Sequence, residues 1–298
     1  MNEIVKYDNY MNGLRFTGFT VIDFNFLMML CSKLRDKGTS EITISFQELR
    51  EKTGYTQHPI KQFVSDLKRM NDKLMKITCS LETETRIIMF VLFPTFEIDL
   101  EKEVLIVSVN QKFKFILNEI VKNFTRFDLK EFIELESKYS KTLYRLLKQF
   151  KTTGKYEISV DDFKEKMDSP KAYTNKQFMQ NIINPALEEL KRKNCFQNLV
   201  CNVKYANKRG KPVTGYLFTF QPEERVPSAL QSTVQQQKKP VTKKTSKPQE
   251  KKKSTNKFCN FEQHSYSKED MELLERALLR NSENITRKND RIEPYTNK

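Results

Sequence analysis

The chain has 298 residues and a formal net charge of +15. That length is enough for two ordinary domains, each with a core of its own. The longest apolar run, residues 87–93, is far shorter than the roughly 20 residues that span a bilayer. The N-terminus also does not have the pattern of a secretory signal peptide. We therefore expect a cytoplasmic protein that has no membrane partner.

The positive charge is unevenly distributed along the chain. Residues 1–226 hold 37 basic and 29 acidic residues, residues 227–258 hold 9 and 1, and residues 259–298 hold 7 and 8. The first part is therefore moderately basic, which is consistent with a partner that carries phosphates. Residues 227–257 contain no aromatic residue, so they bury too little apolar surface to offset the entropy lost on ordering. We predict a disordered linker there, which either binds nucleic acid without sequence preference or only keeps the chain soluble.

The first part of the chain shows the order helix, short strand, two helices and β-hairpin, which is typical of a winged-helix domain. Ser45 and Glu48 form a capping-box pattern that begins the second of these helices, and Gly54 ends it. The other expected elements are an arm over 1–20, helices over 24–37 and 57–75, and strands over 41–44, 76–82, 86–98 and 104–109.

The second part repeats that order, with helices over 129–150, 160–167 and 174–193, and strands over 156–159, 199–205 and 214–220. The similarity reaches individual residues, because Ile44-Ser45 aligns with Ile158-Ser159 and Lys61-Gln62-Phe63 aligns with Lys176-Gln177-Phe178. An internal repeat of this kind indicates two tandem copies of one domain. We predict an α+β fold with these parts: winged-helix domains over 1–122 and 123–226, the linker over 227–257, and a short C-terminal helical segment over 258–298.

The third helix of the second copy has the composition of a DNA-reading helix. Thr174 and Gln177 fit a capping box at its start, and Pro185 predicts a kink or a new helical start. One side is apolar; the other side carries Lys176, Gln177, Gln180, Asn181 and Asn184. Gln and Asn can pair bidentately with adenine, and Lys can reach guanine or phosphate. An ordinary solvated helix face has the same composition, and the helix alone does not separate the two interpretations.

A basic turn follows this helix between two strands, and we predict that it is the DNA-binding wing, with Lys208, Arg209 and Lys211. The third helix of the first copy offers a second, looser set of contacts: Lys61, Gln62, Lys68 and Arg69. This helix also carries Asp66 and Asp72, and acids beside a phosphate backbone weaken binding. We therefore predict that the second copy is the primary reader of DNA sequence.

Two further segments leave alternatives open. The apolar run 87–93 is either a core strand or a strand that pairs across a dimer interface. Beyond the linker, an aromatic cluster over 258–266 precedes a helical stripe of Met271, Leu274 and Leu278. This segment is either a docking peptide that folds on a partner or a helix that packs back on the body.

The sequence lacks the patterns of the common catalytic and metal sites. Two glycine pairs have P-loop spacing, but Phe19 and Tyr216 stand where the lysine belongs. The only histidines, His58 and His264, are far apart, and the five cysteines form no Cys-x-x-Cys pair. We therefore expect no catalytic residue, no metal and no cofactor, so that the chain is not an enzyme, and a nicking or primase-type activity is the least favoured hypothesis.

Several stretches in this order are those of a known family: Gly18-Phe19-Thr20, 30–34, 137–147, 184–190 and 215–220. Over residues 4–222 the chain resembles the twin winged-helix replication initiators of theta-replicating plasmids, the iteron-binding Rep proteins, in the version found in Gram-positive bacteria. The resemblance implies a monomer that binds direct repeats (iterons) at the plasmid origin, promotes opening of AT-rich DNA and recruits host replication proteins.

The resemblance also implies a monomer–dimer equilibrium, in which a dimer joined through the first winged helix represses the initiator's own gene. The expected partners are therefore double-stranded DNA, a second copy of the chain, and host helicase or primosome components that bind through residues 258–281. The alternative is a winged-helix transcription repressor with no role in replication.

Overall fold

The computed structural model describes residues 3–77, 79–82, 87–111, 114–118, 120, 123–207 and 209–223, all of which belong to one compact unit. The predicted linker and C-terminal segment lie outside the described residues. The elements of the first part are β1 (Ile4–Asp8), α1 (Tyr10–Gly13), α2 (Val21–Leu34), β2 (Ile42–Ser45), α3 (Phe46–Thr53), α4 (Ile60–Leu74), β3 (Cys79–Glu82), β4 (Ile87–Phe90), β5 (Phe96–Asp99), β6 (Val104–Val107) and α5 (Lys114–Leu117). Those of the second part are β7 (Phe124–Asp128), α6 (Leu129–Ile133), α7 (Lys138–Gln149), β8 (Lys155–Ser159), α8 (Val160–Lys166), α9 (Asn175–Phe178), a π-helical turn (Met179–Ile183), α10 (Asn184–Arg192), β9 (Val200–Tyr205) and β10 (Val213–Thr219).

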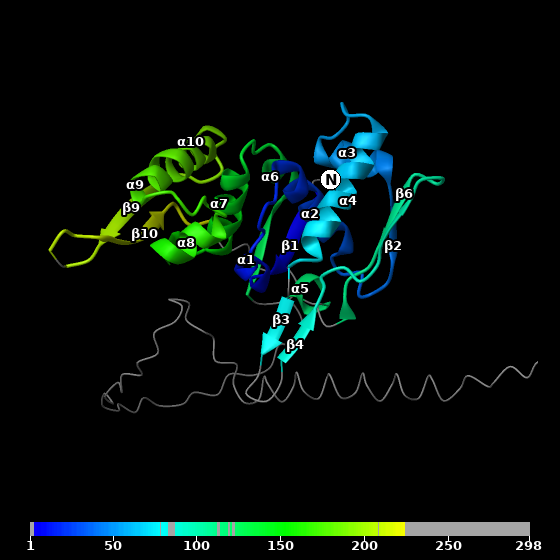
Figure 1. The fold of residues 1–298 in the computed structure, drawn as a ribbon, viewed down its shortest axis with the longest axis horizontal. Helices are drawn as coiled ribbons and strands as arrows, with labels where there is room; N and C mark the ends of the chain where they lie inside the picture. Colours follow the sequence, from blue (N-terminus) through cyan, green and yellow to red (C-terminus); the bar gives the residue numbers. More distant parts are fainter. Residues whose placement is uncertain are drawn as a thin grey trace, which may run out of the picture. The chain divides into compact units, whose positions relative to one another are not determined.

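The two parts contain the same small sheet, as the internal repeat predicts (Figure 1). In the first, strands lie in the order β2-β6-β5, and in the second they lie in the order β8-β10-β9. All neighbouring strands in both sheets are antiparallel. The central strand is the second strand of the hairpin, β6 or β10, because it also pairs with the short strand β2 or β8. The α+β fold with two tandem winged helices is confirmed.

The aligned residues occupy equivalent places in the two copies. Ser45 accepts a hydrogen bond from the Glu48 amide at the start of α3, and Ser159 accepts one from the Asp162 amide at the start of α8. Phe63 on α4 and the aligned Phe178 on α9 are both fully buried. Each copy also has an aromatic core of its own: Phe26, Phe46, Tyr55 and Phe63 in the first, and Phe163, Phe178, Tyr216 and Phe218 in the second.

Among the predicted elements that differ in extent, three have a physical reason that the structure shows. The helix expected over 129–150 is broken between α6 and α7, because Ser137 caps α7 and Lys141 Nζ donates to the carbonyl of Phe132 at 2.6 Å, which ends α6. The strand expected over 86–98 is two strands, since β4 pairs with β3 and β5 with β6, and Pro94, which has no amide to donate, lies between them. The first helix begins at Val21 rather than residue 24, because Thr20 and Asp23 form a capping box.

The apolar run 87–93 divides between core and surface. Leu92 and Phe93 are buried, whereas Met89 on β4 is 66% exposed. The core interpretation is therefore correct for the end of the run. Pairing of this hairpin across a dimer interface stays a prediction.

The N-terminal arm joins the two winged helices. β1 pairs with β7 along its whole length, from Ile4 opposite Asp128 to Asp8 opposite Phe124. These strands lie on opposite sides of the predicted boundary at residues 122 and 123, and the division of the chain at that point stays a prediction. Tyr7, Phe16 and Phe19 of this arm are buried.

A buried polar cluster connects the arm to α7. Asn12, 3% exposed, donates to Thr125 Oγ1 at 2.8 Å and to Gln149 Oε1 at 3.0 Å. Its Oδ1 accepts from Tyr7 Oη at 3.1 Å and from Arg145 Nη1 at 3.0 Å. Asn12 therefore forms hydrogen bonds with four different residues while it is itself buried.

Replacing Asn12 by Ala is expected to lower the free energy of unfolding by about 2–3 kcal/mol, because the Tyr7 hydroxyl and the Arg145 guanidinium then lose a buried acceptor. Urea denaturation of the full chain measures this change. The matched control is Asn202→Ala on β9, where the side chain is exposed, and its effect is expected to stay within about 0.5 kcal/mol. Equal stability losses for the two variants would contradict the role given to Asn12.

Candidate nucleic-acid interface

The helical segment that begins with α9 starts where the sequence predicts. Thr174 Oγ1 accepts a hydrogen bond from the backbone amide of Gln177 at 3.3 Å, and the backbone amide of Thr174 donates to Gln177 Oε1 at 2.9 Å. The predicted capping box is therefore present with both of its hydrogen bonds. It satisfies amides that would otherwise be unpaired at the start of the helix.

The two faces of this segment are separated as predicted. Its core side is formed by residues that are each at most 7% exposed: Phe178, Ile182, Ile183, Ala186, Leu187 and Leu190. The ring of Phe178 packs edge-on against Phe163, at 5.4 Å between centroids, and against Tyr216 at 6.0 Å. The five residues predicted to contact DNA are all exposed: Lys176, Gln177, Gln180, Asn181 and Asn184.

Gln177 differs from the other residues predicted to contact bases because its side chain already forms hydrogen bonds within the protein. Its Oε1 accepts from both the amide and the hydroxyl of Thr174. A bidentate pair with adenine needs both the oxygen and the nitrogen of the side-chain amide, so Gln177 cannot form one while it caps the helix. Gln180, Asn181 and Asn184 make no side-chain hydrogen bond within the described ranges. Their amide groups are available to a ligand.

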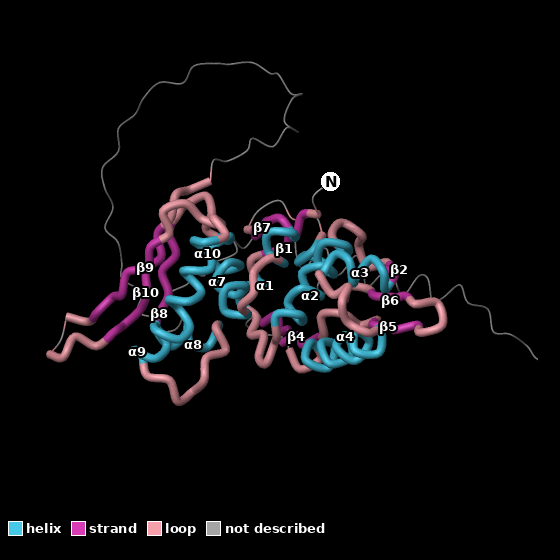
Figure 2. Tube along the Cα trace, turned by 90° about the horizontal axis from the view of Figure 1, so that it is seen from above, coloured by secondary structure: helices cyan, strands magenta, loops and turns pink. Residues whose placement is uncertain are grey.

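The predicted wing is the hairpin of β9 and β10, whose turn extends away from the helices (Figures 1 and 2). The Ala206 amide donates to the Pro212 carbonyl at 2.9 Å and closes the turn. Gly210 has a φ of 83°, a conformation that L-residues rarely adopt. Arg209 and Lys211 are exposed, whereas Lys208, the third predicted wing residue, lies outside the described residues.

One aromatic residue beside the wing was not among the predicted site residues. Tyr205 ends β9 and is 59% exposed. Val203, two positions earlier, pairs directly with the buried Tyr216, so Tyr205 lies on the same face of the sheet as Val203 and α9. A tyrosine at this point can donate to a phosphate oxygen. The strand alternation in 199–205 predicts its face, but only the pairing register shows that it lies beyond the core.

The first copy presents its third helix differently. Lys61, Gln62, Lys68 and Arg69 are exposed on α4, as predicted. Asp66, which was expected to weaken contact with phosphate, is instead 5% exposed. It accepts hydrogen bonds from the Tyr55 hydroxyl and from Gln62 Nε2, and it forms an ion pair with Arg69 Nη1 at 2.6 Å.

The expectation that Asp66 is a surface acid was therefore wrong, because the periodicity of α4 did not reveal the Tyr55 hydroxyl beneath it. Burial, followed by the hydrogen bond to Asp66, raises the pKa of Tyr55 to about 12, so Tyr55 remains a hydrogen-bond donor. Asp66 orients Gln62 and Arg69 and neutralises part of the charge of Arg69. Lys61 and Lys68 are left as the α4 cations that form no ion pair within the described part of the chain.

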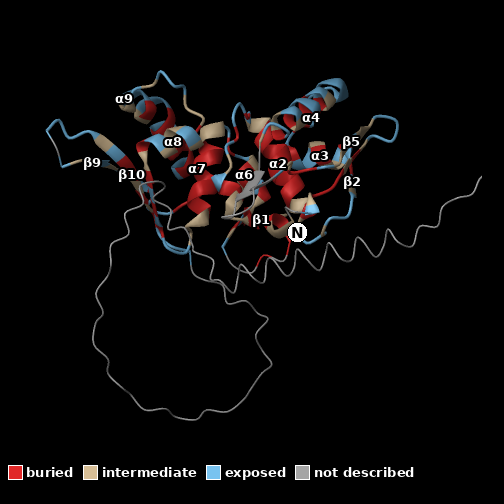
Figure 3. Ribbon diagram, turned by 60° about the horizontal axis from the view of Figure 1, so that its bottom comes forward, coloured by how far each residue is buried: buried red, intermediate tan, exposed pale blue. Residues whose placement is uncertain are grey.

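The exposed faces of α4 and α9 lie on the same side of the described unit. Figure 2 shows α4 and α9 on one side of the unit with β1 and β7 on the other, and Figure 3 shows exposed residues along both helices. Each copy thus directs the third helix of its winged helix toward one common surface.

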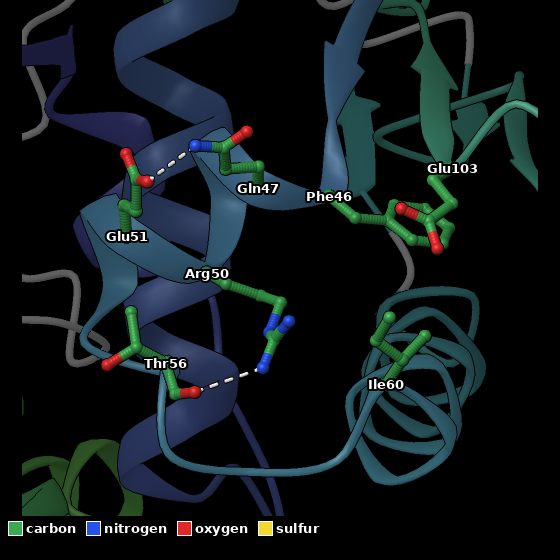
Figure 4. A pocket seen from close by; sticks show the side chains of 7 residues that line it. All are labelled: Phe46, Gln47, Arg50, Glu51, Thr56, Ile60 and Glu103. Atoms are coloured by element: carbon green, nitrogen blue, oxygen red, sulfur yellow. Dashed lines mark hydrogen bonds between the residues drawn. The ribbon is translucent and has the colours of Figure 1, made fainter.

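A small hollow lies between α3, the start of α4 and the β5–β6 turn (Figure 4). Its volume is about 170 Å³, below the range of about 300–1,000 Å³ typical of small-molecule sites. Arg50 spans the turn before α4, donating to the carbonyls of Thr56 at 3.0 Å and His58 at 2.6 Å. The hollow therefore belongs to the turn that positions α4.

The described residues gather no group of three or more His, Cys, Asp or Glu side chains that could hold a metal ion. Within the same ranges, no helix combines the length and the apolar character that crossing a bilayer requires.

Two family models match the chain. Residues 4–148 match the model described as "Initiator Replication protein, WH1", and residues 159–220 match "Initiator Rep protein, WH2". A "Probable replication protein rep" from Bifidobacterium longum (strain NCC 2705) is 34% identical over 222 residues, which is 74% of this chain and 73% of the relative. The crystal structure of Pi initiator protein in complex with iteron DNA is similar in fold, with a TM-score of 0.58 and 15% identity, over 75% of this chain and 98% of that one.

Proposed function

The chain belongs to the family of initiator replication proteins with two winged helices, WH1 and WH2, and from that premise we propose that it initiates plasmid replication by binding direct repeats at the origin. The observation that carries this proposal is the surface of the second winged helix. Three side-chain amides that are unbonded within the described residues share one helical face, beside a basic wing. Such a surface supplies both base-reading and phosphate-binding groups.

The second winged helix is the primary reader in this proposal. The start of α9 enters the major groove, where Gln180, Asn181 and Asn184 read base edges and Lys176 reaches guanine or phosphate. Gln177 holds the helix start in place. The wing meets the DNA backbone through Lys208, Arg209 and Lys211, with Tyr205 as an additional phosphate donor.

The first winged helix makes a second contact on the same DNA. The common orientation of α4 and α9 supports this (Figure 3). Lys61 and Lys68 meet phosphates directly, while Gln62 and Arg69 are preorganised by Asp66. The Pi initiator protein, which shares this fold, was solved with iteron DNA, and that supports direct repeats as the target.

Two finer roles complete the proposal. As a dimer joined through the first winged helix, the chain represses its own gene; the exposed Met89 on the β3–β4 hairpin supports a contact there. As a monomer at the origin, it promotes opening of AT-rich DNA and recruits a host helicase or primosome protein through residues 258–281. The aromatic cluster and apolar stripe of that segment support the recruiting role.

Replacing Gln180 by Ala is expected to weaken binding to the direct repeats that flank the gene by about 1–3 kcal/mol and to relax specificity at one base pair. Fluorescence titrations on a repeat and on a scrambled duplex of equal length measure both effects. Gln197→Ala, which removes an exposed glutamine outside the proposed surface, is the control. If the triple variant Gln180→Ala, Asn181→Ala, Asn184→Ala still discriminates between the repeat and the scrambled duplex, these residues do not read the bases.

Replacing Arg209 or Lys211 by Gln is expected to weaken binding to all DNA sequences alike. Each lost phosphate contact should reduce the slope of log K against log salt by about one. Titrations between low and physiological salt measure the slope. Lys204→Gln is the matched control, because Lys204 is paired with Glu157 across the sheet and its loss should leave the slope unchanged. A wing variant with the same slope as the unmodified chain would exclude a phosphate contact for that residue.

Deleting residues 258–298 is expected to leave binding to the repeats intact and to abolish plasmid maintenance, because the proposed recruiting segment is removed while both winged helices remain. Footprinting and a plasmid-retention assay measure the two properties. A dedicated repressor would keep its whole function after this deletion, so full retention of the plasmid would contradict the recruiting role.

A further inference from the structure

The reading helix contains an irregularity at the place where its free amides lie. Between α9 and α10 the chain forms the π-helical turn Met179–Ile183, in which the Asn184 amide donates to the carbonyl of Met179, five residues earlier. The backbone stays in the right-handed helical region on both sides, with φ and ψ of −60° and −44° at Phe178 and −60° and −49° at Asn184. The segment is therefore one continuous helix with one widened turn.

Pro185 supplies a physical cause for the widening. Proline has no amide hydrogen, and in a regular α-helix its ring collides with the carbonyl four residues earlier, which is that of Asn181. Widening the turn before the proline gives this carbonyl room, and the five-residue bond from the Asn184 amide to the Met179 carbonyl forms immediately before the proline. Pro185 itself is exposed, so packing against the core does not account for a proline at this position.

The widened turn changes the directions of the side chains that are proposed to read bases. A π turn adds one residue to an α-helical turn, so the segment before it is rotated by about 100° relative to an uninterrupted α-helix. Gln180 and Asn181 lie inside the turn and Asn184 follows it directly. The turn therefore sets the spacing among the three amides that are free to pair with bases.

We propose that Pro185 is a positioning residue for base reading: by holding the π turn, it sets the relative directions of Gln180, Asn181 and Asn184 and so selects which bases they read. This inference rests on the proposed function, since it assumes that these amides face DNA. Its chemical basis is that bidentate pairing between an amide and adenine tolerates little change in direction.

The test is Pro185→Ala in the full chain, which supplies the missing amide and allows an α-helical bond to the carbonyl of Asn181. Affinity for the natural repeat is expected to fall by about 10- to 100-fold, the range for one lost bidentate contact. The sequence selected from a randomised duplex pool is expected to change, while affinity for a scrambled duplex at the same salt stays within about twofold. Hydrogen exchange should show that the backbone amide introduced by the substitution is protected.

Two further variants make the result decisive. Pro170→Ala removes another exposed proline, in the loop before α9, and should leave the selected sequence unchanged. Pro185→Gln also restores an amide and should change the selected sequence as Pro185→Ala does; different selections by the two would assign the effect to the side chain and overturn the proposal. Unfolding curves of all three variants verify that the fold is retained.

The failure of this inference is distinguishable from the failure of the proposed function. If Pro185→Ala binds the natural repeat with unchanged affinity and selects the same sequence, Pro185 does not position the readers. If, in the same experiments, the triple alanine variant of Gln180, Asn181 and Asn184 has lost discrimination, the reading face stands and only the role of Pro185 is overturned. If the triple variant also discriminates normally, both are overturned.

Discussion

The arrangement of the two winged helices depends on a buried guanidinium. Arg145 on α7 is 2% exposed; its Nη1 donates to the carbonyl of Met11 at 3.3 Å and to Asn12 Oδ1 at 3.0 Å, and its plane lies over Phe16 at 4.8 Å. A buried charge is costly unless it is hydrogen-bonded, and here the partners come from the N-terminal arm. The arm also pairs with β7 through β1. It therefore connects β1, a strand of the first part, to β7 and α7 of the second part.

The third helices of the two winged helices differ in which of their exposed polar side chains are already bonded within the protein. On α4 two of the predicted contact residues, Gln62 and Arg69, are held within the protein by Asp66. In the helical segment from α9 to α10 the equivalent surface keeps three amides unbonded within the described ranges, and only Gln177 is used internally, as a cap. Groups satisfied internally can still meet phosphate, but base discrimination needs free donors and acceptors in fixed directions. In the proposed function, the copies divide positioning and reading between them.

Membership of the family does not by itself assign the residues. The relative from Bifidobacterium longum is 34% identical over 74% of this chain, whereas the Pi initiator shares the fold at 15% identity. At the lower level the likeness shows the fold alone. The π turn, the engaged Gln177 and the exposed Tyr205 are features of this chain's own residues.

The sequence by itself determined the features that depend on neighbours a few residues apart. Ser45, Ser159 and the Thr174–Gln177 box begin their helices where predicted, and Pro185 signalled an irregularity, because caps and prolines act on amides within one helical turn. The tertiary structure alone decided the burial of Asp66 beneath Tyr55, the break between α6 and α7 made by Lys141, and the place of Tyr205 beyond the core at the end of β9. Those outcomes depend on hydrogen bonds and strand register between residues distant in sequence. The periodicity of a single segment does not report such contacts.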